Sequence, residues 1–119
     1  MKTLLILTTL IITSGCATTP TPWVNKSEVP SKRIHVVAQP MSQEIGHVKI
    51  SRDEGFTGGA CTTKVSLDGV HQFDIDVNER IMISASQGYH IISIVPNGFC
   101  GGGTVETSVD VKGNESRAY

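Results

Sequence analysis

The stretch that decides the fold reads Lys64-Val65-Ser66-Leu67-Asp68-Gly69-Val70-His71-Gln72-Phe73-Asp74-Ile75-Asp76-Val77. Alternating apolar and polar residues flank Asp68-Gly69, and this combination is the strongest short-range signal for a β-hairpin. We expect hairpin arms at residues 62–67 and 70–77. Side chains alternate between the two faces of a strand. The second arm should therefore present two sets of side chains, Gln72, Asp74 and Asp76 on a solvated face and His71, Phe73, Ile75 and Val77 on the other.

Turn signals separate five further β-prone runs, at residues 34–38, 45–52, 80–85, 89–95 and 104–111. We expect the first two to pair or lie adjacent. The run at 89–95 is the most continuously apolar and suits a strand buried on both faces. No stretch of a dozen residues combines helical periodicity with caps. About seven short strands predict an all-β fold, a small antiparallel β-sandwich, with a small barrel as the alternative.

The first residues have the pattern of an export signal. Lys2 precedes an apolar run of about nine residues, too short to span a bilayer as a helix, where about 20 are needed. The run ends at Thr13-Ser14-Gly15-Cys16, which resembles the bacterial lipoprotein signal, in which small residues precede a cysteine that is cut and lipidated. The resemblance implies that residues 1–15 are a signal peptide and that Cys16 becomes the acylated N-terminus. Ordinary signal-peptidase cleavage, for instance after Ala17, is the alternative.

The segment after the signal is expected to hold a domain away from a membrane. Residues 16–31 are rich in Thr, Pro and Ser, as flexible tethers are. We expect Trp23 to dock onto the domain, with contact to a partner protein as the alternative. Residues 32–113 should form the β-sandwich and residues 114–119 a polar tail that frays. In lipoproteins with a similar signal, an aspartate after the cysteine retains the protein at the inner membrane. Ala17 therefore favours the periplasmic face of the outer membrane.

The chain has three cysteines, an odd number for an exported protein. Lipidation of Cys16 would leave one pair, Cys61 and Cys100, each beside a glycine cluster. In the oxidising periplasm these two can form a disulfide that closes a loop of about 40 residues and adds roughly 2–4 kcal/mol of stability. Two free thiols that never meet are the alternative.

The charge of the chain excludes some classes of partner. The full chain has a net charge of −1, and loss of Lys2 with the signal leaves nine of the ten Lys and Arg against eleven Asp and Glu. Nucleic acids and anionic surfaces are bound by clustered basic residues, which this sequence lacks. We therefore expect no nucleic-acid partner, and nothing in the sequence identifies a small-molecule substrate.

Motifs spread along the domain carry a second resemblance: Arg52-Asp53-Glu54-Gly55-Phe56, Cys61, Leu67-Asp68-Gly69, Gly88-Tyr89-His90 and Cys100-Gly101-Gly102-Gly103. Together they resemble a group of small uncharacterised proteobacterial lipoproteins. The central part, in which a strand, Asp-Gly and a second strand precede Gly-x-His, is similar to PEGA domains and to the domain of unknown function DUF2846, over residues 49–111. The resemblance implies an envelope β domain with no known activity.

No residue set in the sequence specifies a reaction, and we expect no catalytic residues, no cofactor and no metal site. No Gly-x-Ser-x-Gly elbow is present. Asp74 and Asp76, with Glu79 nearby, could at most hold calcium weakly. A transition-metal site needs three or four converging ligands. None of the four histidines has close ligand spacing with another: His35, His47, His71 and His90.

The sequence therefore favours binding over chemistry. The leading hypothesis is a lipid-anchored periplasmic domain that acts by protein binding or as part of the envelope structure, without catalysis. An exposed strand edge or hairpin tip could dock another envelope protein, and Tyr89 and Phe99 are the first candidates for that contact. The alternative is an inhibitor of a cell-wall hydrolase such as lysozyme, in which the loop at residues 96–103 would plug the cleft of the enzyme.

Overall fold

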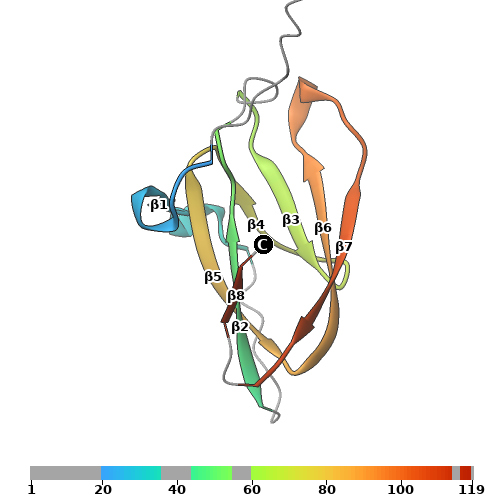
Figure 1. Cartoon of the computed structure of the whole chain (residues 1–119). Coiled ribbons are helices and arrows are strands. Elements are labelled where there is room, and N and C mark those ends of the chain that lie inside the picture. Colours follow the sequence, from blue (N-terminus) through green and yellow to red (C-terminus); the bar gives the residue numbers. More distant parts are fainter. Residues whose placement is uncertain (1–19, 36–43, 55–59, 114–115, 119) are drawn as a thin grey trace, which may run out of the picture.

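The computed structural model describes residues 20–35, 44–54, 60–113 and 116–118, so the expected signal peptide, Cys16 and the start of the tether lie outside it. Within these ranges, eight strands form two four-stranded sheets that pack face to face, which confirms the predicted all-β sandwich (Figure 1). The strand order is β1-β5-β2-β8 in one sheet and β4-β3-β6-β7 in the other. No helix in the described part has the length and apolar character needed to cross a membrane.

Six of the strands, β2 to β7, match predicted runs to within two residues at each end. The strands are β1 (Ser27–Glu28), β2 (Ile45–Ser51), β3 (Thr63–Leu67), β4 (Val70–Ile75), β5 (Glu79–Ser86), β6 (Gly88–Pro96), β7 (Val105–Val111) and β8 (Ser116–Ala118). Three short 3-10 turns accompany them, η1 (Trp23–Asn25), η2 (Ser31–Arg33) and η3 (Gly98–Cys100).

The predicted hairpin is confirmed as the antiparallel pair β3 and β4. Its turn residues Asp68 and Gly69 have φ angles of 50° and 81°. A two-residue turn with positive φ at both positions matches the right-handed twist of the strands that it joins, and Asp-Gly tolerates this backbone better than most pairs. The turn therefore has the chemistry that the sequence predicted.

The pairing of this hairpin contains an irregularity that the sequence did not reveal. Val65 is opposite Phe73, but the next residue, Ser66, is opposite His71. Gln72 is thus an extra residue on β4, a β-bulge, and it is buried. The predicted faces of His71 and Gln72 were wrong, because strict alternation assumes one residue per step on both strands. The bulge leaves His71 on the partly exposed outer face.

The core lies between the two sheets and surrounds one aromatic ring. Phe73 of β4 is wholly buried, and burial of apolar surface stabilises by roughly 25 cal/mol per Å². The bulged strand is therefore held against the opposite sheet by its most buried residue. The other buried apolar residues are Val29, Val48, Ile50, Val65, Leu67, Ile75, Ile81, Ile83, Ala85, Ile92, Val109 and Val111.

The second half of the expected tether belongs to the sandwich. β1 pairs in parallel with the edge of β5, and Val29 enters the core. Lys26 is buried too; its ammonium donates to the carbonyl oxygen of Arg52 at 3.0 Å and forms an ion pair with Asp53. The sandwich therefore begins before residue 32, where the sequence predicted its start. Val29 fills volume in the core, and the buried charge of Lys26 has a carboxylate partner.

The prediction that Trp23 docks onto the domain is confirmed. The Lys49 ammonium and the Arg80 guanidinium lie 5.7 and 5.4 Å from its ring centroid, within the range of cation–π attraction. Arg80 also donates to the carbonyl oxygen of Trp23 at 2.7 Å. These contacts hold the start of the N-terminal segment on the outer face of β5 and β2.

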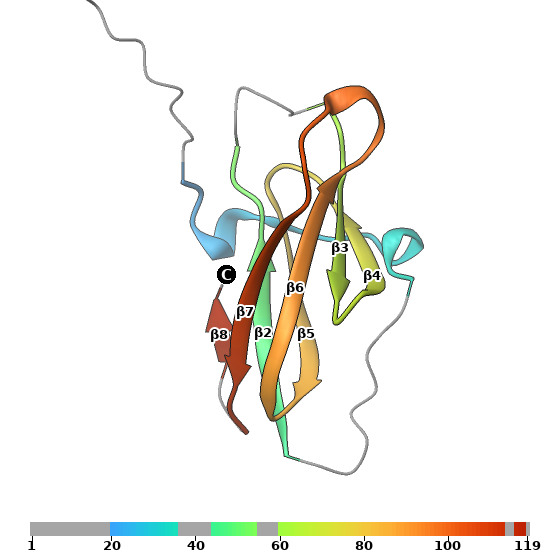
Figure 2. The same ribbon diagram turned by 90° about the vertical axis from the view of Figure 1, so that its right-hand side faces the viewer.

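The N-terminal segment then crosses to the other sheet, as the blue-to-cyan ribbon in Figure 2 shows. Ile34 forms an isolated antiparallel bridge with Phe73 of β4. The expectation that residues 34–38 pair with or lie adjacent to residues 45–52 is wrong at Ile34, because β4 and β2 belong to different sheets; residues 36–38 lie outside the described ranges. The open edge of β4 offers backbone hydrogen-bonding groups, whereas β2 already lies between β5 and β8.

Two expectations for the C-terminal half also need correction. Ile92 of β6 is buried, but Tyr89 is 82 % and Ile91 49 % exposed, because in the described part of the chain no layer covers the outer face of this sheet. The strand is thus buried on one face only. The polar tail expected at residues 114–119 contains β8, which pairs in parallel with β2. Backbone pairing at a sheet edge does not require apolar side chains.

The disulfide is confirmed. Cys61, just before β3, is bonded to Cys100 at the end of η3; their Cα atoms are 6.1 Å apart, and the two residues are 39 positions apart in the sequence. Two contacts of Asn97 hold the same two segments together, since its backbone N–H donates to the carbonyl oxygen of Thr62 and its side chain to the Thr62 hydroxyl, both at 2.9 Å. The disulfide therefore fastens the end of β6 to the start of β3.

Replacing both cysteines, in the double variant Cys61→Ser/Cys100→Ser, should lower the free energy of unfolding by about 2–4 kcal/mol, because the unfolded chain regains the freedom of a loop of about 40 residues. Urea denaturation followed by circular dichroism measures this difference. Wild-type protein in reductant should match the variant, and the variant should not respond to reductant. Equal stability of oxidised wild type and variant would show that the bond does not brace the fold.

Candidate functional site

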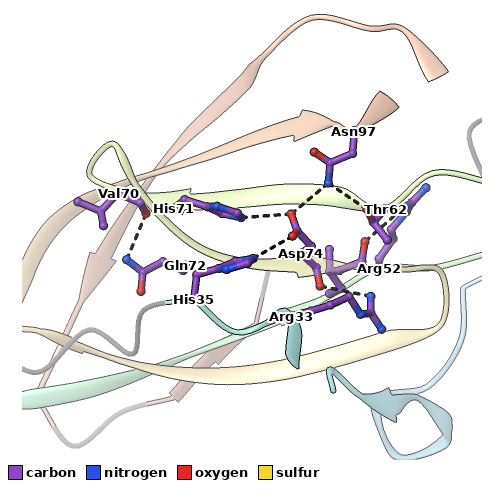
Figure 3. Close-up of polar contacts among 10 residues, drawn as sticks. Arg33, His35, Arg52, Thr62, Val70, His71, Gln72, Asp74 and Asn97 are labelled. Carbon is purple, nitrogen blue, oxygen red and sulfur yellow. Dashed lines mark hydrogen bonds and ion pairs between the residues drawn. The ribbon is translucent and has the colours of Figure 1, made fainter. Parts of the chain in front are cut away.

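Two histidines that are far apart in sequence meet one aspartate on the outer face of β4 (Figure 3). His35 Nε2 lies 3.1 Å from Asp74 Oδ2, and His71 Nε2 lies 3.1 Å from Asp74 Oδ1. The two imidazole rings have centroids 4.3 Å apart. Both rings therefore point at the same carboxylate, one at each oxygen.

The bulge at Gln72 creates this arrangement. His71 and Asp74 are three positions apart, and a regular strand would place them on opposite faces. The extra residue shifts the alternation, so both side chains lie on the outer face. The backbone N–H of His35 donates to the carbonyl oxygen of Gln72 at 2.7 Å, and this bond holds His35 beside the bulge, next to His71 and Asp74.

Further contacts orient the carboxylate from the other side. Asn97 Nδ2 donates to Asp74 Oδ1 at 3.0 Å, and the same nitrogen donates to Thr62 Oγ1. Arg33 donates to the backbone oxygen of Asp74 at 3.3 Å and forms an ion pair with Glu79. The calcium site considered for Asp74, Asp76 and Glu79 is not supported, because Glu79 is paired with Arg33.

The charge of Asp74 follows from these contacts. Its side chain is 19 % exposed, and burial alone would raise its pKa. Hydrogen bonds from His35, Asn97 and His71 outweigh that effect and hold the pKa of Asp74 below its ordinary value. The group is therefore a carboxylate at neutral pH, flanked by two imidazoles that remain 44 % and 32 % exposed.

A third histidine, His90, lies in a different polar group near the β3–β4 turn. His90 Nδ1 is 2.7 Å from Asp68 Oδ2, and its Nε2 is 2.7 Å from the carbonyl oxygen of Ser86. Both partners are acceptors, so the protonated imidazole, which donates from both ring nitrogens, satisfies both contacts. Burial would lower the pKa of His90, but the bonds to Asp68 and Ser86 outweigh it and raise the pKa above its ordinary value.

This second group has the residue types of a hydrolytic triad but not its protonation. Ser86 Oγ lies 3.4 Å from His90 Nε2. A triad histidine must accept the proton of the serine, whereas Nε2 here donates to the Ser86 carbonyl. The group therefore acts as a clasp that joins the β3–β4 turn to the connection between β5 and β6. The fourth histidine, His47, contacts Ser84 on the other sheet at 3.2 Å.

The two predicted contact residues are exposed but do not share a surface. Tyr89 lies at the start of β6 and is 82 % exposed, and Phe99 lies in η3, beyond the other end of that strand, with full exposure. Only Ile91 joins Tyr89 on the same face of β6 as a large exposed apolar residue. Tyr89 with Ile91 is thus one apolar surface, and Phe99 is another.

Searches against protein-family models, curated proteins and solved structures found no match for this chain. The resemblances to lipoproteins, PEGA domains and DUF2846 therefore stay predictions. The His35, His71 and Asp74 cluster was missed by sequence reasoning, because it depends on one bulge and one bridge between distant segments. The one signal in the sequence was the β-prone run at residues 34–38, which contains His35 and so predicted that this histidine would lie on a sheet.

The His90 clasp predicts a pH-dependent stability. Because the pKa of His90 is raised in the folded state, its contribution is complete below the ordinary histidine pKa and is lost as the pH rises through the folded value. Asp68→Asn keeps the turn and removes the charge that raises this pKa. The variant should therefore be destabilised more at about pH 5.5 than at about pH 9, measured by thermal unfolding. An equal effect at both pH values would show that His90 is not charged.

Proposed function

We propose that this protein is a lipid-anchored domain on the periplasmic face of the outer membrane that acts by binding another envelope protein, without catalysis. The observation that carries the proposal is the bond between Cys61 and Cys100. It accounts for both cysteines of the domain and leaves Cys16, the residue at the lipobox-like position, available for acylation. A disulfide also fits an oxidising compartment such as the periplasm.

The apolar surface of Tyr89 and Ile91 supports a binding role. Large apolar side chains on an open sheet face lose contact with water when a partner covers them, and aromatic residues dominate many protein interfaces. Asp110 is opposite Tyr89 on β7, and Ser108 is opposite Ile91. Polar neighbours of this kind form the rim that surrounds the apolar centre of an interface.

Phe99 favours the alternative function, inhibition of a cell-wall hydrolase. It protrudes fully from η3, directly before the disulfide-bonded Cys100. A protruding side chain on a braced loop loses little conformational freedom when it enters a cleft, so such a loop suits an inhibitor. Phe99 lies beyond the opposite end of β6 from Tyr89, so an experiment that probes each residue separately distinguishes this alternative from the leading proposal.

Lipid anchoring predicts a mass and a location. Intact mass of protein from the membrane fraction should fit a triacylated chain that starts at Cys16, with a gain of about two hydrogens on reduction of its disulfide. Cys16→Ser should move the protein to the soluble periplasmic fraction, because acyl chains contribute about 0.8 kcal/mol per buried CH₂ to membrane binding. An unmodified and soluble wild-type chain would contradict the proposed lipid anchoring and membrane location.

The binding role predicts position-specific capture in living cells. A photo-crosslinking amino acid at Tyr89 or Ile91 should capture the same envelope protein, because both positions lie on one surface. Met82, which is 54 % exposed on the other sheet, is the matched control and should not capture it. Capture of a cell-wall hydrolase from Phe99 alone would favour the alternative. No capture from either Tyr89 or Ile91 would contradict the leading proposal.

A further inference from the structure

We infer that His35, His71 and Asp74 form a binding site for a single divalent transition-metal ion of the zinc class. The inference does not depend on lipid anchoring or on a protein partner. It rests on the donor atoms of these three side chains, which all lie within 4.8 Å of one another.

The spacing of the donors fits a metal ion. Zn–N bonds of about 2.0–2.1 Å place the donors of a tetrahedral site roughly 3.3 Å apart. Each histidine Nε2 lies 3.1 Å from an Asp74 oxygen. A small adjustment of the rings would therefore allow both nitrogens and one oxygen to contact the same ion.

The donor types select the metal class. Imidazole nitrogen suits zinc, copper, iron and nickel, whereas calcium and magnesium prefer oxygen donors only. Two imidazoles and one carboxylate are a three-residue ligand set of the kind that leaves at least one position to water or another ligand. Since the His35 and His71 side chains are both partly exposed, an ion can reach them from solvent.

The surroundings hold the ligands in place. Metal sites depend on neighbours that orient their ligands, and Asn97 does this for Asp74 through a bond of 3.0 Å. The bulge at Gln72 positions His71, and the backbone bond to the same residue positions His35. An ion would thus link the N-terminal segment to β4.

The nearby cations do not exclude the ion. The guanidinium of Arg33, which donates to the backbone oxygen of Asp74, is paired with Glu79. Lys64 is opposite Asp74 on β3, but it is exposed, so solvent and salt screen its charge. Neither positive charge therefore neutralises the Asp74 carboxylate, which remains available as an anionic ligand for a metal ion.

The test is calorimetric titration of zinc sulfate into the purified full-length protein after treatment with a chelator. We expect one ion per chain, and no heat of binding with calcium. His35→Gln and His71→Gln should each weaken zinc binding by at least about 10-fold, because loss of a residue that merely orients a ligand already costs 10–100-fold. His47→Gln, on the other sheet, is the matched control and should bind zinc as wild type does.

A second measurement needs no variant. Zinc should shift the imidazole NMR signals of His35 and His71 and leave those of His47 and His90 unchanged. The inference is overturned if wild-type protein shows no saturable binding up to about 1 mM zinc, the weak end of specific affinity. It is also overturned if the double variant His35→Gln/His71→Gln binds zinc as tightly as wild type, or if zinc shifts His47 or His90 instead.

Discussion

The burial of Phe73 constrains the rest of this structure. The ring is wholly enclosed between the sheets, so the register of β4 is set by the need to keep it there. The hairpin turn at Asp68-Gly69 imposes a second register from the other end of the strand. The two registers differ by one residue, and the bulge at Gln72 absorbs the difference. A strand that satisfies both constraints presents His71 and Asp74 on the same face.

The N-terminal segment shows how a polar, proline-containing stretch becomes part of a core. It supplies few apolar residues, but three of its residues contact the sandwich. Val29 packs in the core, Lys26 forms an ion pair with Asp53, and Ile34 pairs with the backbone of Phe73. Since unpaired buried charges are costly, the ion pair of Lys26 is what permits its burial. This route across both sheets carries His35 to β4. The disulfide secures the opposite side, where Asn97 reaches Asp74.

Chemically similar groups have different roles in this molecule because their hydrogen-bond partners differ. His90 faces an acceptor at each ring nitrogen, a carboxylate and a carbonyl oxygen, and these two contacts favour its charged form and make it a clasp. His35 and His71 each contact Asp74 through Nε2 alone and remain partly exposed. A ring nitrogen that does not donate to a backbone carbonyl can bind a metal ion instead. The distinction explains why one histidine and aspartate pair supports the fold and the other is a candidate site.

The sequence by itself determined the local elements of this protein. Alternation and turn chemistry predicted the hairpin, six of the strands and the sandwich, because these depend on neighbouring residues, and the cysteine count predicted the disulfide partners. The tertiary structure decided what depends on contacts between distant segments. Edge pairing drew the N-terminal segment and β8 into the sheets, and the open outer face left Tyr89 exposed. The bulge at Gln72 placed His71 beside His35 and Asp74, since a register is fixed only when both ends of a strand are packed.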